Sequence, residues 1–516
     1  MGERPAEAPA GGPPSLREAL SDPATYPGHP PVTMHETHAS WVFVAGERAY
    51  KVKKPVALGF LDYSSLTRRR RACAEEVRVN RALAPDVYLG VRAIVRSGPH
   101  LRLAPESAPG ALEYAVEMRT FDEADTLAGL IGAQALEPEH VAAAARLLAE
   151  FHRRAPVTRE WGPERVLERC SVNLAELEQS NPPRTWRVDA AAGFARAFVH
   201  AHAEPLRLRS REGFARDGHG DLRCEHVLVR PQLRVVDRIE FDPQLRRIDV
   251  ACDLAFLAMD LEARGARWAA SELFTAYERD GLDCGVPALR SFYATHWALV
   301  RAKVALIAGV EDPARLHEAE GLWLLAARLR WRARGPLLVV ICGPAATGKS
   351  SLAAALSSRA EIAVHASDAV RKRLAGVDPH RRARPEHYSA DFTHATYVQL
   401  ALDATRSLRK DGKAIVDATC RTREDRAALL AGLPDVTRLF VRCQAPLELA
   451  RERAERRLDD ERRLSDATPQ TVEQHFREFE ELEEIAPGEV LRMDTTQAIE
   501  AQLAGLELEL DARGTW

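Results

Sequence analysis

The sequence predicts a multidomain protein in which an α+β region is followed by an α/β region, the second built on a parallel sheet flanked by helices. Three observations lead to this expectation. The chain has 516 residues, more than a single hydrophobic core supports. Short strand-like segments come first and are followed by long helical ones. Near residue 335 the pattern changes to a buried strand, a glycine-rich loop and a helix.

Composition restricts the class of protein. Hydrophobic residues make up 46% and charged residues 28% of the chain, as in folded globular proteins. The net charge of −3 gives no bias toward nucleic acids or membrane surfaces. No apolar run is long enough to predict a membrane span, and the N-terminus lacks the apolar core of a signal peptide. Eight scattered cysteines without a Cys-x-x-Cys pair suggest reduced thiols in a cytoplasm and no structural zinc.

The first elements are short. Residues 1–30 are rich in Pro, Gly and Ala, and we expect them to be partly disordered. Apolar alternation over residues 41–44 and 48–53, on either side of Ala45-Gly46-Glu47, predicts a β-hairpin. Residues 68–83 have the pattern of a charged amphipathic helix.

The later elements are mostly helical. Two further strands are predicted at residues 89–95 and 112–121, and helices follow at 138–151 and 190–203. A short strand pair is predicted at 227–229 and 234–239, and helices resume from residue 249 onward. We therefore expect a strand-rich lobe over residues 31–120, a helical lobe over 121–334, and a separate α/β domain over 336–516.

The strongest motif follows a buried strand at residues 337–342. It reads Gly343, Pro344, Ala345, Ala346, Thr347, Gly348, Lys349, Ser350, and Ser351 continues into a helix. A glycine-rich turn between a strand and a helix points successive backbone N–H groups at phosphate oxygens. The lysine reaches the β- and γ-phosphates, and the hydroxyl of Ser350 binds Mg²⁺. The sequence thus predicts a P-loop with ATP and Mg²⁺ as cofactors.

Two acidic residues fit the same site. Asp417 ends a buried strand, where its carboxylate can orient Mg²⁺, although it can also be an ordinary strand-end aspartate. Asp368 begins a helix and has Arg371 one turn later. The carboxylate can take a proton from an acceptor hydroxyl while the arginine holds an anionic group. The alternative is that Asp368 only caps the helix.

An arginine-rich helix follows near residues 447–463. Arg453 and Arg457 lie on the same face and suit a lid that neutralises charge during phosphoryl transfer. Interleaved acidic residues leave an ordinary charged helix as the alternative.

Residues 337–500 resemble the P-loop small-molecule kinases, a family that includes polynucleotide-kinase-like and zeta-toxin-like enzymes. The resemblance rests on the P-loop, Ser367-Asp368 with Arg371-Lys372, Val416-Asp417-Ala418-Thr419, and Arg453 and Arg457 followed by Ser465-Asp466-Ala467. It implies that Asp368 is the base that activates the acceptor and that Arg371 anchors the substrate. From residue 336 onward there are 26 basic and 30 acidic residues, which disfavours a nucleic-acid substrate.

A second possible site lies in the segment from His219 to His226. Asp221 precedes a strand pair that carries Asp237. In kinase catalytic loops an Asp base is followed five residues later by an Asn metal ligand and then by a second, metal-binding Asp. Asp221 and Asp237 have suitable positions, but His226 stands where asparagine is expected. Imidazole is a less usual Mg²⁺ ligand than oxygen.

The other parts of this site come from the first lobe. Lysine is scarce in the chain, yet Lys51 and Lys53 alternate onto one face of a strand, and either can reach the nucleotide phosphates. Glu76 is the expected ion-pair partner, with Glu75 as the alternative; both can also be solvated helix charges. A later strand carries Glu117 and Met118, whose backbone we expect to hold adenine.

Residues 30–330 resemble the aminoglycoside phosphotransferase-like enzymes, a bilobal branch of the protein-kinase-like fold. The resemblance rests on residues 36–42, 50–55, His219-Gly220-Asp221, 239–241 and 253–257. A kinase-like domain followed by a P-loop domain is similar to a bacterial family described as bifunctional aminoglycoside phosphotransferase/ATP-binding proteins. This implies phosphorylation of a small hydroxylated molecule, such as a sugar or an aminoglycoside-like metabolite.

Three interpretations follow. The chain is a bifunctional phosphotransferase, or a P-loop small-molecule kinase with a degenerate kinase-like regulatory domain, or a polynucleotide-kinase-like or zeta-toxin-like enzyme. The sequence indicates neither the acceptor nor the oligomeric state.

Overall fold

The computed structural model describes residues 15–58, 61–310, 312–378, 381–456 and 466–514. The chain forms two compact units. The N-terminal unit contains the chain up to Trp161 together with Arg209–Cys284, and the C-terminal unit contains Gly162–Leu208 together with Gly285–Trp516. The first 14 residues of the segment expected to be partly disordered lie outside the described residues. Residues 15–30 include helix α1 (Leu16–Leu20).

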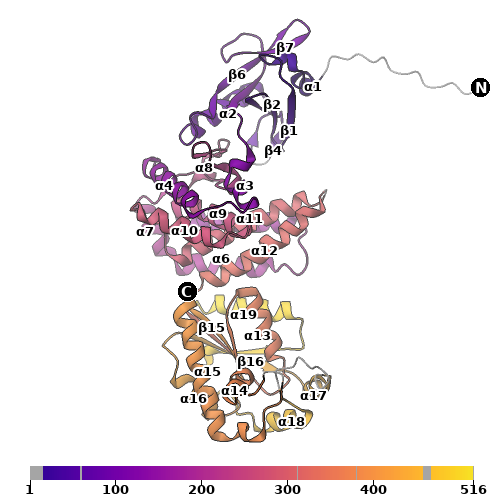
Figure 1. The fold of residues 1–516 in the computed structure, drawn as a ribbon, viewed down its shortest axis with the longest axis vertical. Helices are drawn as coiled ribbons and strands as arrows, with labels where there is room; N and C mark the ends of the chain where they lie inside the picture. Colours follow the sequence, from indigo (N-terminus) through magenta and orange to yellow (C-terminus); the bar gives the residue numbers. More distant parts are fainter. Residues whose placement is uncertain (1–14, 59–60, 311, 379–380, 457–465, 515–516) are drawn as a thin grey trace, which may run out of the picture. The chain divides into compact units, whose positions relative to one another are not determined.

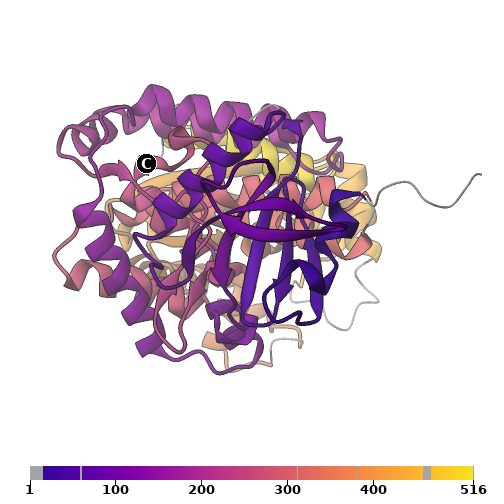
Figure 2. The ribbon, with the colours of Figure 1, turned by 90° about the horizontal axis from the view of Figure 1, so that it is seen from above.

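The N-terminal unit begins with a six-stranded sheet (Figures 1 and 2, indigo to violet). Its order is β1-β2-β3-β8-β6-β7, and every neighbouring pair is antiparallel. The strands are β1 (Val32–Glu36), β2 (Ser40–Ala45), β3 (Arg48–Lys53), β6 (Tyr88–Ser97), β7 (His100–Pro105) and β8 (Ala111–Arg119). The predicted hairpin is β2–β3, and strands β1 and β7 were not predicted. Helix α2 (Leu66–Asn80) packs on β6 and β8 through Cys73 and Val77.

The rest of the N-terminal unit is mainly helical. It contains α3 (Leu127–Gly132), α4 (Pro138–Arg154), α8 (Pro243–Arg246), α9 (Val250–Ala263) and α10 (Arg267–Arg279). Helices α4, α9 and α10 share one core, in which Leu148, Leu257 and Leu273 are fully buried. Two small antiparallel pairs adjoin this core: β9 (Ala215–Asp217) with β12 (Arg247–Asp249), and β10 (Val227–Leu228) with β11 (Arg234–Val235). They support the loop that carries Asp221.

The C-terminal unit contains a five-stranded parallel sheet in the order β14-β15-β13-β16-β17. Its strands are β13 (Leu337–Cys342), β14 (Val364–Ala366), β15 (Lys413–Asp417), β16 (Thr437–Gln444) and β17 (Val490–Asp494). Its helices are α13 (Lys349–Ala360), α14 (Ser367–Leu374), α15 (Ala390–Asp411), α16 (Arg423–Ala431), α17 (Leu447–Arg456), α18 (Pro469–Glu478) and α19 (Ile499–Ala512). The predicted fold class, α+β followed by parallel α/β, is confirmed.

Strand β13 shows why this sheet is buried on both faces. Its six residues are all buried, and alternate side chains face opposite layers. Leu338 and Val340 pack with α15 and α16, whereas Val339 and Ile341 pack with α13 and α19. A strand covered on both sides needs a continuous apolar run, and the sequence of β13 supplies one.

Four helices outside the parallel sheet also belong to the C-terminal unit. They are α5 (Pro163–Gln179), α6 (Val188–Ala201), α11 (Pro287–Ala308) and α12 (Pro313–Ala333). Contacts of α6 with α19 and of α12 with α13 join them to the P-loop domain. Glu507 of α19 accepts hydrogen bonds from Arg330 (3.0 Å) and Trp331 (3.0 Å) of α12. The domain boundary expected near residue 335 stays a prediction.

No helix among the described residues combines the length and hydropathy needed to cross a membrane. All eight cysteines are free thiols and are buried.

Candidate active sites

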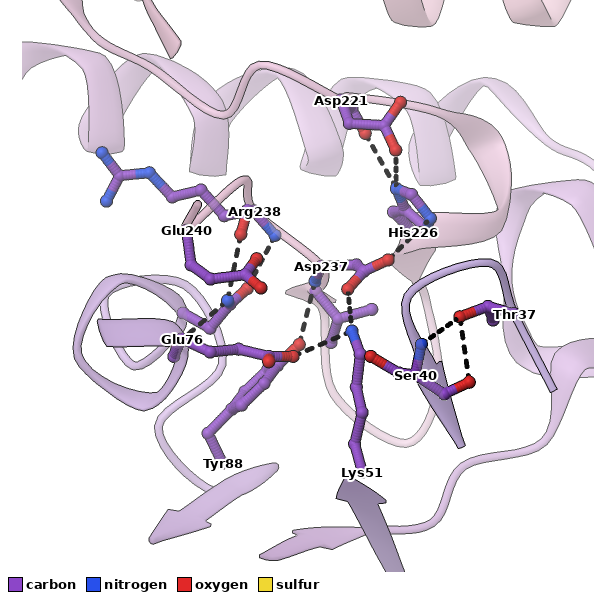
Figure 3. Close-up of polar contacts among 12 residues, drawn as sticks. Thr37, Ser40, Lys51, Glu76, Tyr88, Asp221, His226, Asp237, Arg238 and Glu240 are labelled. Carbon is purple, nitrogen blue, oxygen red and sulfur yellow. Dashed lines mark hydrogen bonds and ion pairs between the residues drawn. The ribbon is translucent and has the colours of Figure 1, made fainter. Parts of the chain in front are cut away.

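The N-terminal site is centred on two lysines of strand β3. Lys51 Nζ lies 2.9 Å from Glu76 Oε1 and 2.8 Å from Asp237 Oδ1 (Figure 3). Lys53 Nζ lies 2.6 Å from Glu76 Oε2 and forms a second ion pair with Glu240. Because residues two apart share a strand face, both ammonium groups reach the same glutamate. The lysine that contacts the strand-pair aspartate is Lys51.

Glu76 is the glutamate that the structure brings to the lysines. Its side chain has no solvent exposure. Burial opposes its ionisation, but the two ammonium groups outweigh burial and hold its pKa below the ordinary value. Glu75 faces elsewhere and pairs with Arg78 (2.6 Å) and Arg246 (3.3 Å).

Asp237 lies at the end of the strand pair in an uncommon backbone conformation. Its φ is +62°, a left-handed value that Asp tolerates better than most side chains. Its backbone N–H donates to Tyr88 Oη at 3.0 Å. The ammonium of Lys51 lowers the pKa of the Asp237 carboxyl strongly against the effect of burial. The carboxylate is therefore ionised over the whole physiological range.

The loop before Asp221 is held by a buried carboxylate. Asp253 of α9 accepts the backbone N–H of His219 at 2.6 Å and of Gly220 at 2.9 Å. The His219 ring donates from Nε2 to Val236 O (2.9 Å) and accepts at Nδ1 from the Asp221 backbone N–H (3.2 Å). Burial lowers the pKa of His219 to about 4, so the ring is neutral at pH 7. These contacts hold the loop backbone and so fix the position of the Asp221 side chain.

Asp221 is paired with an arginine that the sequence reasoning missed. Arg223 donates from Nε to Oδ1 at 3.0 Å and from Nη2 to Oδ2 at 3.1 Å. Burial would raise the pKa of Asp221, but the Arg223 guanidinium reverses this and lowers it. The sequence position could have indicated this pairing, because Arg223 follows the predicted base Asp221 by two residues in the same turn.

Glu117 and Met118 lie within β8, between β3 and β6. Glu117 is opposite Tyr50 and Gly90, and Met118 is opposite Ala49 and Tyr88. The sheet therefore engages the backbone of this strand on both edges. Adenine recognition by these two residues stays a prediction. It would use backbone N–H and C=O groups of a strand that already pairs with β3 and β6.

The predicted P-loop connects β13 to α13. Gly343 has φ +136° and Gly348 has φ +93°. A Cβ at Gly343 would come within 2.7 Å of Cys443 O, and one at Gly348 within 3.0 Å of Thr495 Cβ. Both positions therefore require glycine. Lys349 Nζ donates to Pro344 O at 2.8 Å, which places the ammonium across the loop.

The other predicted P-loop residues gather at the carboxyl ends of the parallel strands, where α/β proteins place their ligands. Asp417 ends β15 and pairs in register with Ile341 of β13 and Ala366 of β14. Ser350 follows Lys349 in the first turn of α13, and Asp368 lies in the first turn of α14.

Arg371 is buried and points at the segment after α14. Its Nη1 donates to His387 O at 2.6 Å and to Thr393 Oγ1 at 3.2 Å. The guanidinium lies over the Tyr388 ring at 4.7 Å. Among the described residues, buried Nε of Arg371 has no hydrogen-bond partner.

Arg453 contacts the loop after β17. It donates to Thr495 O at 2.8 Å, and Thr495 in turn donates to Thr347 O of the P-loop at 2.6 Å. The structure thus links the predicted lid helix to the P-loop through Thr495, a residue absent from the sequence prediction. Arg457, the second predicted lid arginine, lies outside the described residues.

Comparison with known proteins now places the chain. Residues 338–482 match the family model AAA_33, described as an AAA domain. The uncharacterized protein Rv2004c of Mycobacterium tuberculosis is 32% identical over 355 residues, which cover 67% of this chain and 69% of that protein. The chain belongs to the family of this mycobacterial protein. The uncharacterized protein Mb2027c of Mycobacterium bovis shows the same identity and coverage.

Solved structures resemble the chain in two different regions. A choline/ethanolamine kinase family protein from Mesorhizobium loti is 16% identical, with a TM-score of 0.37, and covers 61% of this chain and 94% of its own. Choline kinase from Cryptosporidium parvum is 10% identical, with a TM-score of 0.38, and covers 60% of this chain and 93% of its own. A gluconokinase from Sinorhizobium meliloti is 19% identical, with a TM-score of 0.25, and covers 35% and 95%.

The sheet topology and the P-loop geometry agree with the predicted classes. The N-terminal region has an antiparallel lobe followed by a helical one, as expected from the sequence. The C-terminal region contains a domain that matches the AAA_33 model, with a P-loop and a parallel sheet. Phosphotransferase activity stays a proposal for this chain.

Proposed function

We propose that the chain is a bifunctional ATP-dependent phosphotransferase with two kinase sites. Each site transfers the γ-phosphoryl group of ATP to a hydroxyl of a small molecule, such as a sugar or an aminoglycoside-like metabolite. The observation that carries the proposal is the assembly of Lys51, Glu76, Asp237 and Asp221 beside one another. These residues come from four separate segments, and a merely structural domain has no need to gather them.

In the N-terminal site we assign the following roles. Lys51, held by Glu76, contacts the nucleotide phosphates. Asp221 orients the acceptor hydroxyl and accepts its proton. Phosphoryl transfer passes through a loose transition state, so an ionised, well-positioned carboxylate suffices even though its pKa is low. Arg223, which touches Asp221, is placed to neutralise charge on the transferred group.

A divalent cation fits this site by its donor set. Asp237 offers a carboxylate that Lys51 keeps ionised, and His226 offers a ring nitrogen 3.7 Å from Asp237 Oδ2. When bound, such a cation neutralises charge on the β- and γ-phosphates. Asp237 and His226 would hold it.

In the P-loop site, Lys349 and the backbone N–H groups of residues 343–348 would hold the phosphates, and Ser350 and Asp417 would hold Mg²⁺. Asp368 accepts the proton of the acceptor hydroxyl, and Arg371 binds an anionic group of the substrate through its unpaired Nε. Arg453 is placed to bring the lid helix to the P-loop through Thr495.

The test uses the full-length protein with Lys349→Ala, Asp221→Asn and the double variant. ATP-dependent phosphorylation of a bacterial metabolite extract is followed by mass spectrometry. We expect each single variant to lose a different set of phosphorylated products and the double variant to lose both sets. If Lys349→Ala alone removes every product, the bifunctional proposal is wrong.

Two observations favour a second candidate function. His226 replaces the asparagine expected of an active kinase loop, and Arg223 holds both oxygens of Asp221. The N-terminal unit would then bind a nucleotide or another ligand as a regulator of the P-loop kinase. In that case Asp221→Asn changes the rate of the P-loop reaction but removes no product.

A further inference from the structure

The histidine in the metal position has an unusual set of neighbours. The His226 ring lies between the Asp221 carbonyl and the Asp237 carboxylate (Figure 3). Nδ1 is 2.8 Å from Asp221 O, and Nε2 is 3.2 Å from Arg223 Nη2 and 3.7 Å from Asp237 Oδ2. The side chain is 8% exposed. Its orientation is therefore set by the catalytic loop.

Two independent contacts fix the tautomer of this ring. A carbonyl oxygen only accepts hydrogen bonds, so Nδ1 carries the proton that Asp221 O receives. A guanidinium only donates, so Nε2 presents its lone pair to Arg223. A histidine held through Nδ1–H by a backbone carbonyl, with Nε2 as the donor atom, is the arrangement common in metal-ligating histidines.

The two oxygens of the Asp237 carboxylate also have different neighbours. Its Oδ1 contacts Lys51 at 2.8 Å, whereas Oδ2 faces the His226 ring. One carboxylate oxygen and one imidazole nitrogen thus face each other. This donor pair differs from the all-oxygen set of a carboxylate and an amide that the asparagine would have supplied.

We propose that the N-terminal site takes its nucleotide with a first-row transition cation, Mn²⁺, in preference to Mg²⁺, and that His226 Nε2 is a ligand of that cation. The inference rests on the proposed nucleotide site. Mg²⁺ binds oxygen ligands and dehydrates reluctantly. Mn²⁺ also accepts carboxylate and phosphate oxygens, and imidazole nitrogen suits transition ions far better than Mg²⁺. Arg223 occupies Nε2 until the cation replaces it.

The experiment uses full-length Lys349→Ala protein, in which the P-loop has lost its phosphate lysine. Mn²⁺ and ADP are added, and pulsed EPR detects whether a ¹⁴N nucleus of an imidazole is bonded to the Mn²⁺. We expect this nitrogen coupling in Lys349→Ala and its loss in Lys349→Ala/His226→Asn. The matched control is Lys349→Ala/His475→Asn, because His475 is a histidine of the P-loop unit that lies within electrostatic reach of Lys349, and the coupling should persist there.

Nucleotide affinity provides a second readout. In the Lys349→Ala background we expect ADP to bind about tenfold more tightly with Mn²⁺ than with Mg²⁺. His226→Asn should bring the ratio close to one, because asparagine restores an oxygen donor. If His226→Asn fails to fold, the nitrogen coupling is still measured in Lys349→Ala and in Lys349→Ala/His475→Asn. Its absence from both proteins contradicts the inference.

Two outcomes overturn the inference in distinguishable ways. Nucleotide binding that is equally tight with both cations, without nitrogen coupling, removes the role of His226 and leaves the proposed kinase site intact. Failure of the Lys349→Ala protein to bind nucleotide with either cation removes the N-terminal kinase site itself, and this inference with it.

Discussion

Lys53 is predicted to be a structural residue of the N-terminal site, and Lys53→Met tests this. The side chain is 2% exposed and is paired with Glu76 and Glu240. In the wild type, Lys51 and Lys53 face three carboxylates, those of Glu76, Glu240 and Asp237. The substitution leaves three carboxylates with one ammonium. Removing one partner of a buried ion pair costs about 3–5 kcal/mol.

The matched control is the next residue. Lys54 pairs with Glu36 at 2.6 Å, and the glutamate side chain is 39% exposed. A pair open to solvent contributes about 0–1 kcal/mol. Lys54→Met should therefore leave the stability of the N-terminal unit nearly unchanged.

Hydrogen exchange followed by mass spectrometry measures the effect locally, because the two units need not unfold together. We expect amides of β3 and α2 to exchange at least about 100-fold faster in Lys53→Met, and amides of β13 and α13 to be unaffected. The loss of stability caused by Lys53→Met should become smaller as the pH falls from 7 to 5. Without Lys53, Glu240 keeps the hydroxyl of Tyr63 as a partner, and protonation of the carboxylate cluster at lower pH relieves the excess negative charge.

Two results would refute this reasoning. A deficit that is the same at pH 7 and pH 5 would mean that Lys53→Met acts through lost packing and not through charge. Exchange in β3 that is no faster than in Lys54→Met would mean that Lys53 is not part of the stabilising cluster.

Three further predictions follow from single contacts. Gly348→Ala should abolish nucleotide binding by the P-loop, because its Cβ would meet Thr495 at 3.0 Å and its φ is +93°; calorimetry of nucleotide binding in a Lys51→Ala background checks this. Asp253→Asn should lower turnover at the N-terminal site by at least about tenfold, since an amide replaces the carboxylate that accepts the His219 and Gly220 N–H groups; the products lost with Asp221→Asn report it. The pKa of His219 is lowered from 6.5 to about 4, so its contribution to stability is complete above pH 6.5 and is lost as the pH falls toward 4, by about 3 kcal/mol. Hydrogen exchange of the catalytic loop that is unchanged between pH 6.5 and 4.5, after correction for intrinsic rates, would contradict it.

The P-loop was predictable because all its determinants are local. The strand, the two glycines with positive φ, the lysine and the helix lie within one short stretch of chain, so the order of residue types is itself the structural information. Asp417 was predictable for a related reason. A buried strand that ends in an acid places the carboxylate at the same sheet edge as the P-loop.

The choice between Lys51 and Lys53 was not predictable from periodicity. Two residues apart on a strand, both side chains lie on one face, and no local pattern separates them. The structure separates them through Asp237 and Glu240, which lie more than 180 residues later. Which carboxylate meets which lysine depends on the turn at Asp237, where φ is +62°.

The packing of helices α5, α6, α11 and α12 illustrates a second limit. An amphipathic pattern shows that a face is buried, but it does not name the surface that covers it. Here the covering surface includes α19, whose Glu507 accepts from Arg330 and Trp331. A buried carboxylate is costly unless it is paired, so Glu507 signals that α19 has a polar partner inside the unit. Only the tertiary structure shows that the partner is α12 and that these helices pack in the same compact unit as the parallel sheet.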